Sequence, residues 1–283
     1  MSDKRGPASG VRPLEELPIV VQCRGVKKSY GNRVVLRGVD LTVHKGQTVV
    51  VMGGSGHGKS TLLRLMIGAE KPDAGSIEIF GQDIGHLTEE EMYPLKKRFG
   101  VLFQSGALFN SMTCGENIAL PIREHAKLDE KIIEIIVKLK LELVGLRDAE
   151  QLIPAQISGG MRKRVGLARA IALDPEIIFY DEPGAGLDPI MLAAIDELIL
   201  GLSKKLGVAS IVVTHEMQSA FRIADYMVLL HGGVIVAEGT PDEMRASKDP
   251  LVQQFIQGKA EGPVPLRQSG KDLVKDLLEG AGE

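Results

Sequence analysis

The sequence predicts an α/β fold with a mainly parallel core sheet, an antiparallel β subdomain near its start and an inserted helical subdomain. Two observations support this prediction. Apolar runs alternate with helix-periodic segments between residues 176 and 225, a pattern typical of parallel strands that helices cover on both faces. A mostly helix-periodic region from about residue 113 to 173 precedes this alternation and predicts the helical insertion.

The first predicted elements are β-rich runs separated by turn residues. The runs cover residues 19–26, 34–43 and 47–53. Gly31 and Asn32 lie between the first two runs, and Lys45 and Gly46 lie before the third. Because these residue types favour turns, we expect an antiparallel patch that leads into a buried strand.

The later elements follow from hydrophobic periodicity and from helix stop signals. A predicted helix at 59–69 ends at the turn of residues 71–75, which contains proline and glycine. Strands are predicted at 76–80 and within 100–109, and an amphipathic helix at 130–146. The remaining predicted elements are strands at 176–182 and 209–216 and helices at 190–207 and 217–225.

Composition suggests the domain boundaries. Residues 1–18 contain charges, proline and glycine but no apolar run, so we expect a disordered leader and not a signal peptide. Residues 19–257 form the predicted domain, with its helical subdomain at about 105–175, and residues 258–283 form a C-terminal extension. No run reaches the roughly 18 apolar residues of a membrane span. Any membrane work would therefore need another chain.

Charge and cysteine content exclude several classes of function. The chain of 283 residues has 34 Lys and Arg against 37 Asp and Glu, a net charge of −3, which predicts no general attraction to nucleic acid or to an anionic membrane. Cys23 and Cys114 have neither metal-ligand nor redox spacing. A chain of this size buries a core without disulfides, so we expect a protein of the reducing cytosol.

A glycine-rich loop predicts a nucleotide site. Residues 53–60 match G-x-x-x-x-G-K-S between a predicted strand and a predicted helix. Glycines let backbone N–H groups approach phosphates, Lys59 adds positive charge beside the β- and γ-oxygens, and the Ser60 hydroxyl suits Mg²⁺. The alternative is a turn that only caps a helix. The predicted phosphate-loop residues are Gly53, Gly54, Ser55, Gly56, His57, Gly58, Lys59, Ser60 and Thr61.

Two carboxylates end the predicted strand 176–182, at the edge where parallel sheets bind ligands. Asp181 is placed to hold Mg²⁺ through water, and Glu182 to orient or deprotonate the attacking water. Taken alone, the pair is equally compatible with an exposed acidic turn. Its position beside a phosphate loop favours the catalytic interpretation.

Several further residues are weak signals when taken singly. Gln104 and His215 each end a predicted strand, and Tyr30 follows one, but an ordinary glutamine, a structural histidine or a packing tyrosine would explain them. A second anion-binding helix start lies at residues 158–160 in "ISGGMRKRV". One nucleotide does not obviously need two such sites.

The order and separation of these motifs resemble the ATP-binding-cassette (ABC) ATPases over residues 19 to 257. The resemblance implies a P-loop NTPase of the ABC type, in which Tyr30 stacks on adenine, Gln104 is the Q-loop glutamine and a Mg²⁺ ligand, and His215 is the switch histidine. Residues 53–61 resemble the Walker A loop. The other implied site residues are the Walker B pair Asp181 and Glu182, Asp188 of the D-loop, and the signature residues Ser158, Gly159, Gly160 and Met161.

The resemblance also explains the second anion site. In this family the signature helix faces the nucleotide of a second cassette, so the resemblance implies a homodimer with each ATP held between Lys59 of one copy and Ser158 of the other. It further implies a peripheral protein on the cytoplasmic face of the bacterial inner membrane, where ATP hydrolysis drives integral-membrane permease subunits.

One departure narrows the resemblance to a branch of the family. The signature ends in Met161, where most members have glutamine, although Ser158 and the Gly160 N–H can still bind phosphate. This exchange, together with "FQSGALF" and the tail "FIQGKAEGPVPLR", resembles the ATPases of MCE-type lipid transporters. The branch implies phospholipid transport between the inner and outer membranes with an MCE-domain lipid-binding protein.

Two other functions stay open. The ATPase of a small-solute importer, for example for a polar amino acid, would share every catalytic residue. A nucleotide-gated protein of translation or DNA repair would usually carry two cassettes or long coiled coils, and neither is present in this sequence. Intact Glu182 and His215 argue against an inactive binding module, and we expect no nucleic-acid partner.

The C-terminal extension has a pattern of its own. Pro263 and Pro265 favour an extended path, and Ser269 and Asp272 have the spacing of a capping box ahead of a short apolar stripe at residues 273–278. A helix this short is marginal alone in water. We expect it to pack on its own domain, to fray, or to clasp the partner subunit.

Overall fold

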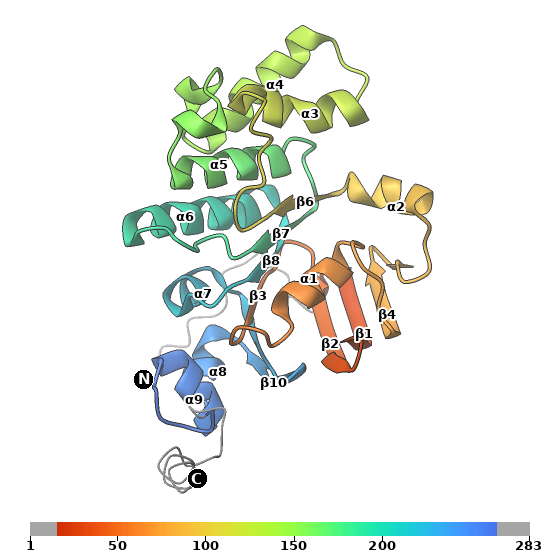
Figure 1. The fold of residues 1–283 in the computed structure, drawn as a ribbon, viewed down its shortest axis with the longest axis vertical. Coiled ribbons are helices and arrows are strands. Elements are labelled where there is room, and N and C mark those ends of the chain that lie inside the picture. Colours follow the sequence, from red (N-terminus) through yellow and green to blue (C-terminus); the bar gives the residue numbers. More distant parts are fainter. Residues whose placement is uncertain (1–15, 265–283) are drawn as a thin grey trace, which may run out of the picture. The chain divides into compact units, whose positions relative to one another are not determined.

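The computed structural model describes residues 16–264, which divide into one compact unit up to Pro241 and another from Asp242 (Figure 1). Most of the expected leader (1–18) and most of the expected extension (258–283), including the whole predicted tail helix, lie outside the described residues.

The first unit contains two β-sheets. The smaller sheet is antiparallel. In the larger sheet the four adjacent pairs formed by β9, β3, β8, β7 and β6 are parallel, and the fifth pair, β10 on β9, is antiparallel. The smaller sheet has the order β2 (Arg33–His44), β1 (Ile19–Tyr30), β4 (Ala74–Ile79), β5 (Gln82–Asp83). The larger has the order β10 (Val234–Gly239), β9 (Tyr226–His231), β3 (Thr48–Met52), β8 (Ala209–Val213), β7 (Ile177–Asp181), β6 (Phe99–Leu102). The mainly parallel core and the antiparallel subdomain are therefore confirmed.

The central strands explain why the core sheet is parallel. Every residue of β3 and β8 is buried, and both strands are rich in valine and isoleucine, as expected for strands with helices on both faces. Helix α1 (Lys59–Met66) contacts β7 and β8 on one side. Helices α6 (Pro189–Leu206) and α7 (Met217–Ile223) contact β8 and β3 on the other side (Figure 1).

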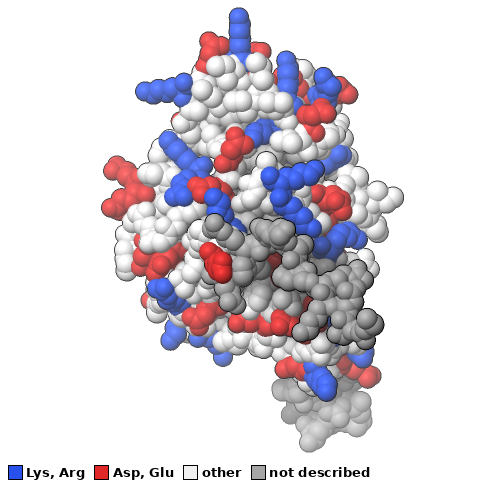
Figure 2. Space-filling view, turned by 180° about the vertical axis from the view of Figure 1, so that it is seen from behind, with Lys and Arg blue, Asp and Glu red and all other residues white. Residues whose placement is uncertain are grey.

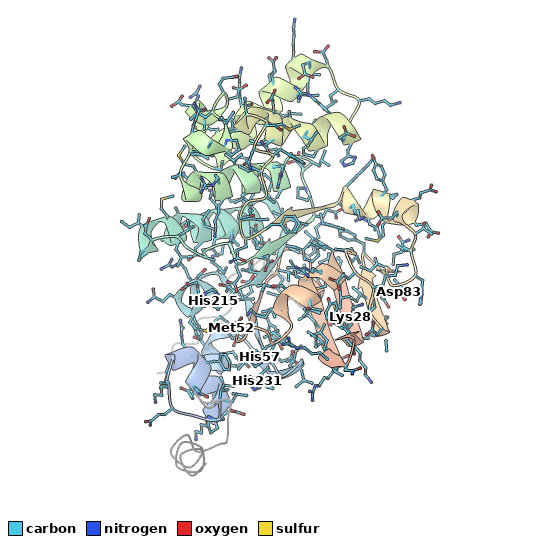
Figure 3. The ribbon with its side chains drawn as sticks, viewed as in Figure 1. Lys28, Met52, His57, Asp83, His215 and His231 are labelled. Atoms are coloured by element: carbon cyan, nitrogen blue, oxygen red, sulfur yellow. The ribbon has the colours of Figure 1, made fainter. Side chains whose placement is uncertain are left out.

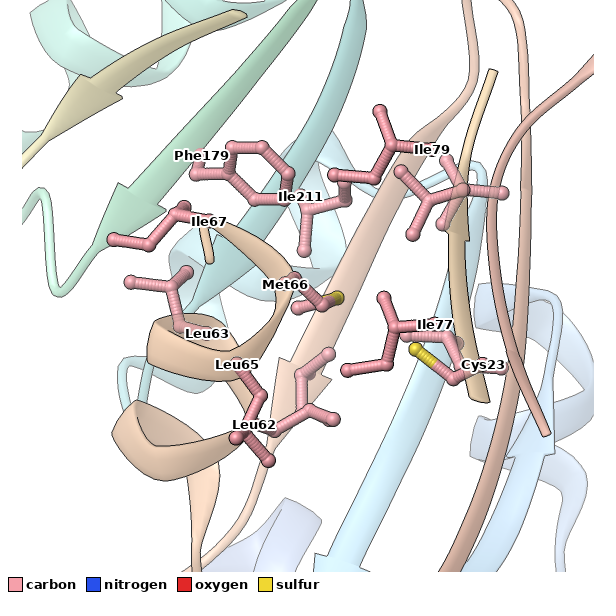
Figure 4. Packing of buried hydrophobic residues seen from close by; sticks show 14 of the residues in the cluster. Cys23, Leu62, Leu63, Leu65, Met66, Ile67, Ile77, Ile79, Phe179 and Ile211 are labelled. Carbon is pink, nitrogen blue, oxygen red and sulfur yellow. The ribbon is translucent and has the colours of Figure 1, made fainter. Parts of the chain in front are cut away.

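Helix α1 is packed between the two sheets. Its apolar side chains meet the antiparallel sheet on one side and the core sheet on the other, and the cluster is buried (Figure 4). This cluster includes Leu62, Met66, Cys23, Ile77, Ile79, Phe179 and Ile211. Close packing on two sides fixes the helix axis, and so fixes where its N-terminus points.

The helical subdomain lies between β6 and β7 in the sequence. It contains α3 (Cys114–His125), α4 (Glu130–Leu143) and α5 (Gly159–Ala170), with short 3₁₀ turns at Arg147–Ala149 and Pro154–Gln156. Thr113 and Glu116 form a capping box on α3, Asp129 caps α4 and Ser158 caps α5, which satisfies N–H groups that the helix itself leaves unpaired. The helical insertion is confirmed.

Three local predictions differ from the structure. Strand β6 ends at Leu102 and Gln104 follows in a turn, because Gly106 has φ +78° and its N–H donates to Phe103 O at 2.8 Å. Strand β8 ends at Val213, two residues before His215. Helix α2 (Glu89–Lys96) and the β9–β10 hairpin have no counterpart in the sequence prediction.

The second unit contains α8 (Pro241–Ala246) from its second residue onward and the whole of α9 (Pro250–Gln257). Asp249 caps α9, and Gly258 ends it with φ +62°. The Gln254 side chain then exchanges two hydrogen bonds with the backbone of Val264, at 2.9 Å and 2.8 Å. The described end of the chain is thus tied back onto α9.

The described surface carries charges of both signs. On the face shown in Figure 2, basic and acidic side chains are interspersed over the described residues. Within residues 16–264, no helix combines the length and the apolar content that a membrane span requires.

Candidate active site

A cavity of about 630 Å³ opens at the N-terminus of α1. It collects residues from the β1–β2 hairpin, the phosphate loop, the loop after β6 and the ends of β7 and β8. These residues are Tyr30, Arg33, Val35, Ser55, Gly56, Gly58, Lys59, Ser60, Thr61, Gln104, Glu182 and His215. Most of the residues predicted from separate motifs therefore meet in one place.

The phosphate loop needs glycine for reasons of space as well as conformation. At Gly53, with φ +153°, an added Cβ would lie 2.2 Å from the carbonyl oxygen of Leu230. At Gly58, with φ +104°, it would lie 2.7 Å from a methyl carbon of Leu36. Gly58 is the N-cap of α1 and provides no side-chain cap. The first N–H groups of α1 are therefore free of a side-chain cap and suit a phosphate.

Lys59 is a buried ammonium at the centre of the site. Its Nζ donates to the carbonyl oxygens of Gly53 at 2.8 Å and Gly54 at 3.0 Å and lies 4.0 Å from Glu182 Oε1. Burial lowers the pKa of Lys59, while Glu182 and Asp181 act in the opposite direction. Loop carbonyls accept two of the three ammonium protons of Lys59, so the third proton is available to a phosphate while the side chain stays bound to the loop.

Two of the three predicted Mg²⁺ ligands are in contact, and the third lines the cavity. Ser60 Oγ donates to Asp181 Oδ1 at 3.3 Å, and Gln104 lines the cavity that Ser60 also lines. Burial raises the pKa of Asp181 and Glu182 adds to this, whereas the bond from Ser60 lowers it. Hydroxyl, carboxylate and amide oxygens are ligands that Mg²⁺ prefers, together with substrate phosphates and water. The residues present therefore fit this ion.

Glu182 and His215 form a pair at the rim. The carboxylate Oε2 lies 2.8 Å from His215 Nδ1 and accepts the His215 N–H at 3.3 Å. Glu182 has φ +49°, an unusual backbone conformation for a residue with a side chain. Its carboxylate is held in one place by His215 and faces the cavity, as a general base must be.

Tyr30 lines the cavity together with two residues that the sequence analysis missed. The Tyr30 ring is 44% exposed at the cavity edge, and its hydroxyl bonds to the Glu70 carboxylate, so the ring is placed where a base could stack. Arg33 and Val35 line the same cavity. Arg33 and Val35 are two positions apart in β2, so their side chains point to the same face of the sheet. This two-residue spacing after Tyr30 can be read from the sequence.

His57 is part of the phosphate loop, but its side chain does not line the cavity. Its ring packs on His231 with centroids 4.4 Å apart, and its Nδ1 accepts the Gly232 N–H at 2.9 Å (Figure 3). Burial, His231 and Lys59 lower the pKa of His57. The side chain thus fastens the loop to the β9–β10 turn.

The signature residues lie apart from this cavity. Ser158 caps α5 and accepts the Met161 N–H at 3.2 Å, and Asp188 caps α6. An added Cβ on Gly160 would lie 2.9 Å from the Met191 methyl group. None of Ser158, Gly159, Gly160, Met161 and Asp188 lines the 630 Å³ cavity.

Known proteins of one family are similar to this chain. The sequence profile of the ABC transporter family matches residues 36–185. The "Intermembrane phospholipid transport system ATP-binding protein MlaF" of Haemophilus influenzae is 44% identical over 260 residues, covering 92% of this chain and 98% of the relative. The "Probable ribonucleotide transport ATP-binding protein mkl" of Mycobacterium tuberculosis is 42% identical over 250 residues, covering 88% of this chain and 70% of the relative.

A solved structure has the same fold. The dimeric ATP-binding cassette MJ0796, in a post-hydrolysis state with ADP and Pi bound, superposes with a TM-score of 0.73 at 29% identity, covering 78% of this chain and 98% of that one. Phosphate loop, acidic pair and histidine thus occur here in a fold shared with a nucleotide-binding cassette. From the family match, the relatives and this geometry, the chain belongs to the ABC transporter family, as an ATP-hydrolysing cassette.

Proposed function

We propose that this chain is the ATPase subunit of a transporter that moves phospholipid between the inner and outer membranes. Two copies bind two ATP and act on permease subunits at the cytoplasmic face of the bacterial inner membrane, together with an MCE-domain lipid-binding protein. The observation that carries the catalytic part is the Glu182–His215 pair beside Lys59 in one cavity. The 44% identity with MlaF carries the lipid part.

The residues divide the reaction between them. Lys59 and the N–H groups of the loop bind the phosphates, and the Tyr30 ring stacks on the adenine base of ATP. Glu182 accepts a proton from the attacking water, while His215 holds the carboxylate in position. Ser60, Asp181 and Gln104 would hold Mg²⁺, whose chemistry is to neutralise charge on the phosphate oxygens. No step needs a covalent intermediate on the protein.

The isolated signature helix supports the dimer. Ser158 at the start of α5 offers a hydroxyl and helix N–H groups to an anion, yet the cavity of its own chain does not include it. In a head-to-tail pair, Ser158 of one copy closes the cavity over Lys59 of the other. A closed interface of this kind excludes water, which strengthens every charge interaction at the γ-phosphate.

An apolar hollow beside Gln104 supports a permease partner. Its volume is about 440 Å³, and the residues of the loop after β6 contribute Phe103 and Phe109, which are 40% and 50% exposed. Leu120 and Pro121 of α3 complete the apolar wall. A permease helix seated there would contact the loop that carries Gln104, which links transport to the ATP site.

The substrate class is tested on the native complex. We would purify the complex through a tag on this chain, identify its membrane partners, and analyse the bound small molecules by mass spectrometry. Phospholipid together with an MCE-domain protein supports the proposal. A polar solute with a different permease would support the second candidate, a small-solute transporter, for which the mycobacterial relative named for ribonucleotide transport is the specific observation.

A further inference from the structure

Lys163 is a buried lysine in the second turn of α5 that the proposed mechanism does not use. It is 5% exposed. Its Nζ donates to the carbonyl oxygens of Glu182 at 3.2 Å, Pro183 at 2.8 Å and Ala185 at 2.6 Å. An ammonium has three protons, so these three acceptors satisfy it completely. Every hydrogen bond of this buried charge therefore goes to the one backbone turn that carries Glu182.

The turn that carries Glu182 has an unfavourable backbone conformation, which its surroundings must stabilise. Glu182 has φ +49°, and a residue with a side chain keeps such a conformation only where its surroundings impose it. On the strand side, the Glu182 N–H donates to Val213 O at 2.9 Å. Within the turn, the Ala185 N–H donates to Glu182 O at 3.1 Å. Lys163 provides the link from the turn to α5.

The same helix begins at Ser158. A shift of α5 along its axis would move Lys163, and Lys163 would pull directly on the carbonyl group of Glu182. No side chain other than Lys163 is needed to connect the start of the signature helix with the catalytic turn. Ser158 and Glu182 are connected in this way within one chain. In a head-to-tail pair, however, Ser158 faces the partner's nucleotide and Glu182 faces the nucleotide of its own chain.

We propose that Lys163 is a positioning residue that holds the backbone of Glu182 and couples it to the nucleotide bound at the start of α5. The inference rests on the proposed function, because only a head-to-tail dimer puts the partner's nucleotide at Ser158. Lys163 then makes the position of Glu182 at one ATP depend on occupancy of the other site. Hydrolysis at the two sites is cooperative for this reason.

The test compares three variants of the full chain in the assembled transporter. Lys163→Met keeps the length of the side chain and removes its donors, and Lys163→Arg restores donors. Arg164→Met is the matched control, since Arg164 is the next residue on α5 and its Nη1 donates to Val144 O at 3.3 Å, away from the turn. ATP affinity, the number of ATP bound, kcat and the Hill coefficient are measured for each.

We expect Lys163→Met to lower kcat about 10²-fold, because a displacement of about 1 Å in a catalytic group has that effect. Its ATP affinity and stoichiometry should stay at wild-type values, and its Hill coefficient should fall towards 1. Lys163→Arg should recover most of the rate, and Arg164→Met should keep it. A lysine that only stabilises the fold would instead lower kcat and the number of ATP bound together.

A double-mutant cycle separates positioning from other roles. If Lys163 acts through Glu182, Lys163→Met should have no further effect on the residual rate in a Glu182→Gln background. A wild-type kcat for Lys163→Met, or additive losses in the cycle, would overturn the inference. If Lys163→Met does not fold, Lys163→Gln serves instead: a lower kcat at constant ATP affinity supports the inference, and a wild-type kcat overturns it. Activity of Glu182→Gln alone would count against the proposed function itself.

Discussion

The replacement Glu182→Gln tests the catalytic assignment most closely. Glutamine keeps an oxygen that can accept the His215 N–H, now 3.3 Å from Oε2, but the neutral amide cannot take a proton from water. Loss of a general base lowers turnover by about 10²- to 10⁴-fold, which corresponds to roughly 3–5 kcal/mol of activation free energy. We therefore expect kcat to fall by at least 10²-fold.

Binding should survive the same replacement. Lys59 keeps its bonds to Gly53 O and Gly54 O, and removal of a negative charge near the γ-phosphate position does not weaken ATP affinity. Glu182→Gln should therefore accumulate as an ATP-bound dimer. Phosphate release gives kcat, titration with a fluorescent ATP analogue gives affinity, and light scattering gives the mass with and without ATP.

Glu216→Gln is the matched control for this experiment. Glu216 lies on the same rim, with Oε1 3.7 Å from His215 Nε2, and does not line the cavity. We expect this variant to hydrolyse ATP at close to the wild-type rate. A Glu182→Gln protein that also keeps a near wild-type rate would remove Glu182 from the role of base.

Three further predictions concern stability and assembly. Because the pKa of His57 is lowered, its contribution to the free energy of unfolding is complete above the ordinary histidine pKa and is lost as pH falls through the lowered value. The variant His57→Asn keeps an acceptor for the Gly232 N–H and should therefore lose less melting temperature than the wild type between pH 7.5 and 5.5. An equal loss in both proteins would exclude His57 as the cause. Gly201→Ala, inside α6 with no atom within 4 Å of the new Cβ, should raise the free energy of unfolding by about 1 kcal/mol in urea titration, and a decrease would contradict the helix packing. Deletion of residues 259–283 should lower the nucleotide-free dimer fraction in light scattering and the ATPase rate of the transporter if the extension clasps the partner, and a truncated protein that is as dimeric and as active would show that it does not.

The sequence alone predicted those features that depend on local pattern. The phosphate loop, the acidic pair after an apolar strand and the alternation of strands with helices are each visible in short windows, because loop chemistry and periodicity are local. The strand within 100–109 is predicted to end at Gln104, whereas β6 ends at Leu102, because Phe103 and Phe109 line an exposed hollow and are not part of the strand.

Features that depend on distant contacts could not be predicted. His57 looked like one more loop residue, and only the fold brings it to His231 and the Gly232 N–H. In the sequence Lys163 is one of three consecutive basic residues after the signature, and its role depends on three carbonyl groups of the turn that carries Glu182. Such contacts have no short-range pattern.

The central claim is that each ATP lies between two chains, and heterodimers test it most directly. Subunits with Lys59→Ala and subunits with Ser158→Arg, carrying different tags, are mixed and purified as heterodimers. One site then has both elements intact, and the other has neither. We expect native mass spectrometry to find one ATP per heterodimer. Equal occupancy of both sites would contradict the head-to-tail arrangement.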